Sequence, residues 1–136
     1  MQQLVLALVI VIYKYILMKN TTAVGNSAET LACEYLEGKG YKIVGRNYKD
    51  RFCEIDIVAC NKDYIVFVEV KYRSRADYGG AAGAVTPAKL AQMTRAAEFY
   101  LSQHQEFNNH QPRLDVVTIS GDLSRAELEH IENCTE

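Results

Sequence analysis

Two acidic residues and a lysine stand in a stretch of the chain that otherwise has the composition of a hydrophobic core. In the segment CEIDIVACNKDYIVFVEVKYRS, residues 53–74, Asp56, Glu69 and Lys71 lie among isoleucine, valine and phenylalanine. Charged side chains are rarely buried unless they are paired or hold a metal ion. Carboxylate oxygens favour Mg²⁺ or Mn²⁺ over zinc, and a nearby lysine can help to deprotonate water or stabilise charge on a phosphate. The alternative is an exposed strand face with a weak surface ion pair.

The spacing predicts a β-hairpin that carries these residues on one side. A two-residue turn at residues 61–62 would place Asp56 opposite Phe67. Residues that oppose each other across a hairpin share a face of the sheet, and so do residues two apart along a strand. Asp56, Glu69 and Lys71 would therefore project from the same side, where the two carboxylates could converge on one cation.

Hydrophobic periodicity predicts the elements that position this hairpin. Apolar residues between 28 and 36 recur at the spacing of one helix face, and a second stripe runs from 90 to 101 after a Thr86-Pro87 start signal. Stretches rich in β-branched and aromatic residues predict strands at 42–48, 52–60, 64–72 and 113–120. The predicted order is α-β-β-β-α-β, a mixed α/β sheet with helices packed against it.

Length and charge limit the function further. A chain of 136 residues suggests one domain, and its net charge of −2 does not mark the whole molecule as a binder of polyanions. Residues 39–95, however, hold 11 Lys and Arg against 6 Asp and Glu, while the rest of the chain holds 4 against 11. Such a basic middle could meet a phosphate backbone. The four cysteines show no zinc-binding spacing, so we expect reduced thiols and a cytoplasmic protein.

Residues 1–24 form an apolar extension before a domain at 25–136. The apolar stretch through Met18 covers 15 residues with a lysine inside it, and as a helix it would reach ~22 Å against a hydrocarbon core of ~30 Å. It fits a signal peptide poorly. If residues 1–17 are translated and anchor the chain, the domain would lie on the cytoplasmic side of a membrane. The interpretation we favour is that translation starts at Met18.

The hairpin and its surroundings resemble a known family. The pattern D-(x)12-E-V-K, with a glutamate on the preceding helix, resembles the PD-(D/E)XK nuclease superfamily. More closely, residues 25–119 resemble the YraN-like uncharacterised protein family, which is related to archaeal Holliday junction resolvases. The stretches that carry this resemblance are GNSAETLACEYLEGKGYKIVGRNY, CEIDIVA, VFVEVKYRS, AVTPAKLAQMTRAAEFYL and RLDVVTI. The resemblance implies a restriction-endonuclease-like fold for residues 25–136.

The resemblance also implies roles for single residues. Asp56 and Glu69 match the ligands of Mg²⁺ (or Mn²⁺), and Lys71 matches the catalytic lysine. Glu54 belongs to the family signature and would support these ligands without contacting the metal. Cys53 stands where the family usually has glycine, which adds bulk where a close approach is needed.

Glu29 matches the superfamily's accessory catalytic glutamate, although it could instead close a capping box with Asn26. The implied function is a metal-dependent DNA endonuclease that hydrolyses phosphodiesters, in branched or damaged DNA. The alternative is a non-catalytic nucleic-acid-binding or assembly module on a nuclease fold. Resolvase-like relatives work as dimers, so a homodimer is a further expectation. Candidate phosphate contacts, as basic residues around the site, are Arg46, Arg51, Arg73, Arg75, Lys89 and Arg95.

Overall fold

The computed structural model describes residues 27–73 and 85–135, together with residues 2, 3, 5, 9 and 12. A helix of residues 27–38 comes first. It is followed by β1 (Lys42–Lys49), β2 (Glu54–Cys60), β3 (Tyr64–Arg73), α2 (Pro87–Gln103), η2 (Gln105–Phe107), β4 (Gln111–Ser120), η3 (Leu123–Arg125) and β5 (Glu127–Ile131). The predicted order α-β-β-β-α-β is confirmed, and the fold adds β5 and two short 3₁₀ turns that the sequence pattern did not predict.

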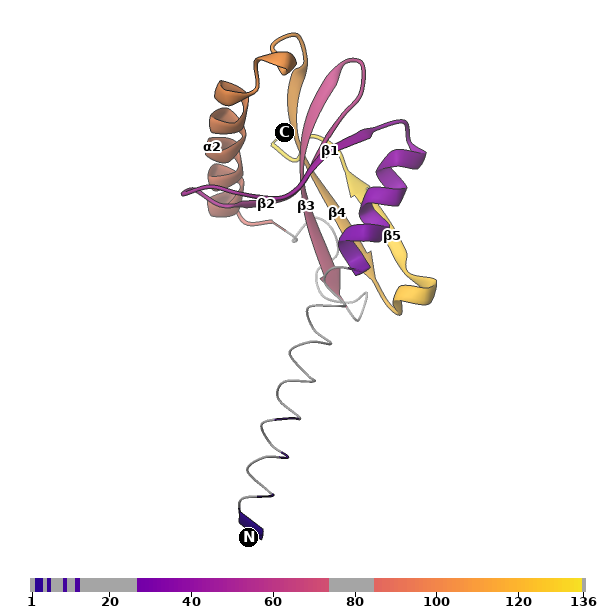
Figure 1. Ribbon diagram of the computed structural model, residues 1–136. Coiled ribbons are helices and arrows are strands. Elements are labelled where there is room, and N and C mark those ends of the chain that lie inside the picture. The colour runs from indigo at the N-terminus through magenta and orange to yellow at the C-terminus, as the bar shows by residue number, and fades with distance from the viewer. Residues whose placement is uncertain are drawn as a thin grey trace.

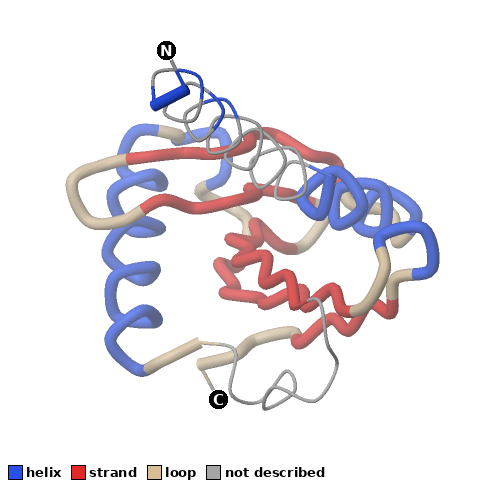
Figure 2. Tube along the Cα trace, turned by 90° about the horizontal axis from the view of Figure 1, so that it is seen from below, coloured by secondary structure: helices blue, strands red, loops and turns tan. Residues whose placement is uncertain are grey.

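The strands form one mixed sheet in the order β1-β2-β3-β4-β5. Only β3 and β4 run parallel; the other neighbours are antiparallel. A parallel pair needs a long crossover connection, and α2 lies within that crossover. Figure 2 shows the sheet between α2 on one side and the 27–38 helix on the other. The molecule is therefore a three-layer α/β protein.

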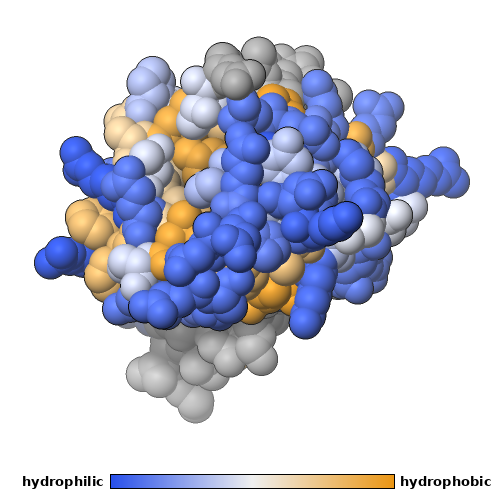
Figure 3. Space-filling view, turned by 90° about the horizontal axis from the view of Figure 1, so that it is seen from above, coloured by the Kyte–Doolittle hydropathy of each residue, from blue (hydrophilic) through white to orange (hydrophobic). Residues whose placement is uncertain are grey.

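Both faces of the sheet are buried, which explains the continuous apolar runs in its central strands. The side of the 27–38 helix buries Ala32, Leu36, Ile57, Val66, Val68, Val117 and Ile119 with their neighbours. The side of α2 buries Val58, Ile65, Phe67, Met93, Ala96, Tyr100 and Leu114 with theirs. Figure 3 shows the molecule from the end of the sheet at which β3 and β4 begin. Hydrophilic residues dominate this surface, and apolar residues appear in separate patches.

Both helices carry the end signals that their sequences predict. Gly40 has φ +93°, and the N–H of Tyr41 donates to the carbonyl of Leu36, which is the glycine-terminated Schellman arrangement. At the start of α2, the Thr86 side chain accepts the backbone N–H of Lys89, and proline occupies the first turn. These caps fix where α2 begins, and the candidate site depends on that position.

The predicted two-residue turn between β2 and β3 is wrong. The first pair after the turn is Cys60 with Ile65, so Phe67 lies opposite Val58 and not opposite Asp56. The reason is the Asn61 side chain, whose oxygen accepts two backbone N–H groups and folds a longer loop. Because the register moves by two residues, each side chain in the paired stretch, residues 57–60 and 65–68, keeps its predicted face.

Some expectations fall on residues outside the described part of the chain. The extension 1–24 is described at five positions only, and Asn26 and Arg75 are not described. The domain boundary at residue 25 and the capping box therefore stay predictions. Within the described residues, no helix combines the length and the apolar character needed to cross a membrane.

Candidate active site

A bend in the β1–β2 hairpin creates the local geometry of the site. Ile55 belongs to the core on the α2 side, whereas Ile57 belongs to the core on the side of the 27–38 helix. Residues two apart on a regular strand share a face, so the strand turns over at Asp56. On β1, Asn47 lies opposite Asp56, between the paired residues on either side of it. Asn47 has φ 53°, a left-handed conformation that asparagine tolerates better than most residues. Figure 1 shows the bent end of β1 and β2 reaching over α2.

The bend leaves Asp56 where β2 separates from β3. The last paired residues are Ile57 and Val68. Beyond them, Asp56 Oδ2 accepts the backbone N–H of Val70 at 2.8 Å. A carboxylate thus takes the place of a ladder hydrogen bond, which holds the side chain beside the next acidic residue, Glu69.

Glu69 is nearly fully buried and is held by two lysines. Its Oε1 lies 3.2 Å from Lys71 Nζ on the same strand, and its Oε2 lies 3.7 Å from Lys89 Nζ in the first turn of α2. The Glu69 side chain is 7% exposed, whereas the lysines are 31% and 28% exposed. The C-terminal end of β3 and the N-terminal end of α2 lie at the same end of the molecule in Figure 1. The structure therefore brings a cation from α2 to the predicted Glu-Val-Lys motif.

Asp56 lies among other carboxylates, whose negative charges disfavour its ionised form. Burial, followed by the charge of Glu69, raises the pKa of Asp56 to about 7. Glu29 and Glu54 raise it further, and the hydrogen bond from Val70 acts in the opposite direction. A carboxylate whose ionised form is disfavoured in this way is a favourable setting for a cation, which would relieve the repulsion.

Glu29 joins the site from the 27–38 helix. Its Oε2 is buried and makes no hydrogen bond, although Arg46 Nη2 on β1 lies 3.7 Å away. Arg46 also donates to the Thr30 hydroxyl. A buried carboxylate oxygen without a hydrogen-bond donor is costly, so this atom has an unfilled capacity for a water or a cation.

These residues fit a hard divalent cation. Asp56 and Glu69 offer oxygen atoms only, the ligand type of Mg²⁺ and Mn²⁺, and both have neighbours whose negative charge a cation would offset. In the part of the chain that the structure describes, no group of three or more histidine, cysteine or acidic side chains is arranged to hold a metal ion. A bound metal would therefore need other oxygen ligands, such as water or phosphate.

The remaining predicted residues lie at different distances from this centre. Glu54 is exposed at the start of β2. Cys53 is half-buried, and burial raises the pKa of its thiol while Lys89 lowers it, which places Cys53 beside the site. Three basic residues are exposed and make no ion pair with the site among the described contacts: Arg51, Arg73 and Arg95.

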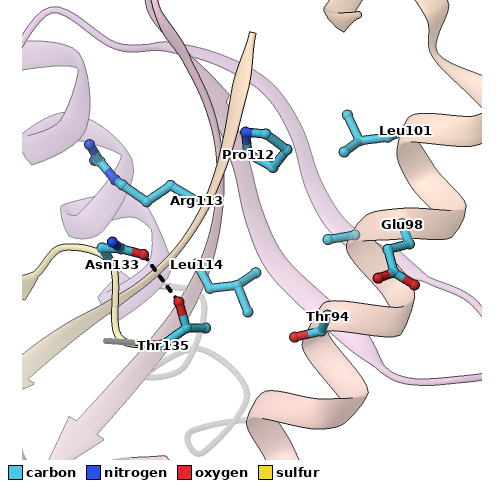
Figure 4. Close-up of a pocket in the computed structure, with 9 residues that line it drawn as sticks. Thr94, Glu98, Leu101, Pro112, Arg113, Leu114, Asn133 and Thr135 are labelled. Carbon is cyan, nitrogen blue, oxygen red and sulfur yellow. Dashed lines mark hydrogen bonds between the residues drawn. The ribbon is translucent and has the colours of Figure 1, made fainter.

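A separate cavity of about 250 Å³ opens between α2 and the start of β4. Figure 4 shows Leu114 directed toward α2 and Arg113 directed away from it. The Thr135 hydroxyl donates a hydrogen bond to the side-chain oxygen of Asn133, which also lines the cavity. The Arg113 guanidinium binds Asp115 and the Tyr41 hydroxyl. The cavity contains none of the predicted site residues, so it is distinct from the carboxylate cluster formed by Glu29, Asp56 and Glu69.

Sequence reasoning did not find the contact between Lys89 and Glu69. Lys89 entered only as one of several basic residues, because twenty positions separate it from Glu69. Its place three residues after a Thr-Pro cap is the one signal in the sequence, since a cation in the first turn of a helix opposes the helix dipole.

Asp56→Asn should stabilise the metal-free protein above neutral pH. The folded-state pKa of Asp56 is raised to about 7, above an unfolded value of about 3.9. Stability from the protonated carboxyl is then fully present at low pH and is lost as the pH rises through this window. With a chelator at about pH 8, the free energy of unfolding in urea should rise by about 1–2 kcal/mol.

The difference between variant and wild type should disappear below about pH 3, where the carboxyl is largely protonated in both the folded and the unfolded protein. Asp63→Asn, in the exposed turn between β2 and β3, is the matched control and should change little at either pH. Equal stability of wild type and Asp56→Asn at the higher pH would contradict the destabilising environment described for Asp56.

The fold defines the class of the protein first: it is an α/β protein whose element order is compatible with the restriction-endonuclease-like fold. A family model described as "Uncharacterised protein family UPF0102" matches residues 28–119. This chain belongs to the UPF0102 family, which is the YraN-like family that the sequence resembles.

Individual relatives agree with this assignment. A UPF0102 protein of Pseudomonas putida strain GB-1 is 39% identical over 100 residues, which cover 74% of this chain and 81% of that protein. One from Vibrio parahaemolyticus is 42% identical over 96 residues, 71% and 79% of the two chains. One from Stutzerimonas stutzeri strain A1501 is 35% identical over 119 residues, 88% and 99% of the two chains. The similarity therefore extends along nearly the whole length of a relative.

Proposed function

We propose that this protein is a metal-dependent DNA endonuclease that hydrolyses phosphodiesters, with branched or damaged DNA as its substrate. The observation that carries the proposal is the convergence of Asp56, Glu69 and Lys71 at the point where β2 and β3 separate. A buried carboxylate and a half-buried one beside a lysine form an arrangement that a strand needs neither for packing nor for a surface ion pair.

In the reaction, water oxygen forms a bond to phosphorus and one bridging P–O bond breaks. The leaving oxygen takes a proton from the water, so the products are a hydroxyl and a phosphate monoester. Asp56 and Glu69 would hold Mg²⁺ or Mn²⁺, which supplies a polarised phosphate and a more acidic water. Lys71, whose Nζ lies 3.2 Å from Glu69, directs a positive charge at the phosphate or at the attacking water. Glu29 is within electrostatic reach of Asp56 and can accept a proton from water.

Basic residues around the centre provide the contacts to the nucleic acid backbone. Arg51 lies in the turn between β1 and β2, Arg73 ends β3, and Arg95 is exposed on α2. Each would contribute to binding that weakens as salt rises. A cytoplasmic location fits this proposal, because the cysteines at 33, 53, 60 and 134 are all free thiols and would stay reduced there.

The test is cleavage of labelled DNA by the full chain. The panel contains a four-way junction, a flap and a linear duplex, each with Mg²⁺, with Mn²⁺ and with EDTA. We expect cuts that require the metal, and the preferred structure will identify the substrate. Asp56→Ala, purified in parallel, excludes a contaminating nuclease and should give no cuts.

Binding of DNA without metal-dependent cuts, unchanged in Asp56→Ala, would overturn the endonuclease. It would leave the alternative of a binding or assembly module on a nuclease fold. Cysteine at position 53, where the family usually has glycine, is the feature of this chain that favours such a module, because the Cys53 side chain lies beside Lys89 and Glu69.

A further inference from the structure

The contacts of Glu69 raise a question about how a metal could reach it. Lys71 is paired with one oxygen of this carboxylate and Lys89 with the other. With the side chain only 7% exposed, solvent does little to weaken either pair. A divalent cation that binds Glu69 would therefore share the carboxylate with two ammonium groups, whose positive charges oppose that of the metal.

We infer that Lys89 is an internal competitor for the metal, which a phosphate of the nucleic acid draws away from Glu69. The inference rests on the proposed function and adds to it a rule of assembly: metal and nucleic acid bind with positive coupling. Without nucleic acid, Lys89 neutralises Glu69 and weakens the metal site. With nucleic acid bound, Lys89 contacts a phosphate and leaves Glu69 free to coordinate the metal.

Of the two lysines, Lys89 is the one suited to this exchange. Lys71 lies two residues from Glu69 on the same strand, so their proximity is built into the strand. Lys89 comes from another element, and its longer contact of 3.7 Å is easier to replace. Its side chain is 28% exposed, which gives a phosphate access to the ammonium group.

The position of Lys89 in α2 provides a second reason. The Thr86 cap fixes Lys89 in the first turn, where the helix dipole is positive and a cation is unfavourable. No acidic residue lies in that first turn to offset it. Glu69 is the carboxylate that compensates the charge of Lys89. When Glu69 coordinates a metal ion, another anion is needed beside the Lys89 ammonium group. The phosphodiester backbone is the anion that a nuclease site receives.

The test compares two affinities of the Lys89→Met protein that should change in opposite directions. In a calorimetric titration with Mn²⁺ alone, Lys89→Met should bind the ion about fivefold more tightly than wild type, because the competing positive charge is gone. Binding to a labelled DNA duplex in EDTA should be weaker, and its dependence on salt should fall by about one phosphate contact.

Two control proteins separate this exchange from a general change of charge. Lys62→Met, in the exposed β2–β3 turn, makes the same replacement away from the site and should leave the affinity for Mn²⁺ unchanged. Lys89→Arg retains the positive charge and should keep the metal affinity near that of wild type.

The outcomes distinguish this inference from the function on which it rests. If neither wild type nor Lys89→Met binds Mn²⁺, with or without DNA, the endonuclease proposal fails and this inference fails with it. If wild type binds Mn²⁺ and Lys89→Met binds it equally well or less well, only the competitor role of Lys89 is overturned. An unchanged affinity for DNA in Lys89→Met would likewise exclude transfer of Lys89 to a phosphate.

Discussion

Lys71→Met should lower the rate of DNA cleavage by about 10³-fold while binding of DNA changes by less than about tenfold. The ammonium group lies 3.2 Å from the Glu69 carboxylate. Under the proposed function, charge that develops on the phosphate during hydrolysis would be stabilised by this ammonium group more than in water, because the surroundings are partly desolvated. The proposed contacts of Arg51, Arg73 and Arg95 with the DNA backbone remain in this variant, so the loss should lie in turnover.

Single-turnover cleavage of the preferred DNA, with protein in excess, measures this loss directly. Lys62→Met is the matched control and should retain the wild-type rate, since Lys62 lies in the exposed turn between β2 and β3. Because Lys89 still pairs with Glu69 in this variant, the protein should stay folded, which its unfolding midpoint checks. A rate within about threefold of wild type would remove Lys71 from the chemistry.

Asp115→Asn should destabilise the fold by about 3–5 kcal/mol. Asp115 on β4 is fully buried, and its carboxylate accepts hydrogen bonds from the Arg113 guanidinium at 2.9 and 2.8 Å and from the Asn133 backbone at 3.0 Å. His130 on β5 lies 2.7 Å away. Loss of the negative charge leaves the Arg113 cation buried without its partner, which is the costly way to break a buried ion pair.

The pH dependence of this effect has a defined sign. Burial acts to raise the pKa of Asp115, but the hydrogen bonds of His130 and Arg113 outweigh it and hold the pKa below its usual value. The stabilisation is therefore present above the unfolded pKa of about 3.9 and is lost as the pH falls through the lower folded pKa. The gap between wild type and Asp115→Asn should narrow in that acidic range.

Urea unfolding at neutral and acidic pH, with Asp63→Asn as an exposed control, checks both statements. A loss of less than about 1 kcal/mol at neutral pH would mean that Arg113 finds another partner, and Glu132 is the nearest candidate, with 3.8 Å between the charged atoms. The contacts of Asp115 also matter for the architecture, because its hydrogen bond with His130 links β5 to β4. We expect protease sensitivity of the C-terminal segment to rise in Asp115→Asn.

Local patterns account for the elements that the sequence predicted correctly. The 3.6-residue stripes, the Thr86-Pro87 start and the glycine end of the 27–38 helix act within a few residues of chain. Glu69 and Lys71 share a face because they are two apart on a strand. The strand β5 was missed because five residues, largely acidic and polar, carry no hydrophobic pattern of their own. Its place in the sheet depends on pairing with β4, which the residues of β5 do not reveal on their own.

The sequence by itself determined the order of the elements, the family, and the types of residue on the hairpin. Only the tertiary structure decided the register beyond Asn61, the bend at Asp56, and the reach of Lys89 to Glu69. The physical reason is one of range: periodicity and capping depend on neighbouring residues, whereas the carboxylate cluster forms from elements that meet only when the sheet is packed between its helices. Burial then sets the charge of Asp56, and burial is a property of the assembled layers.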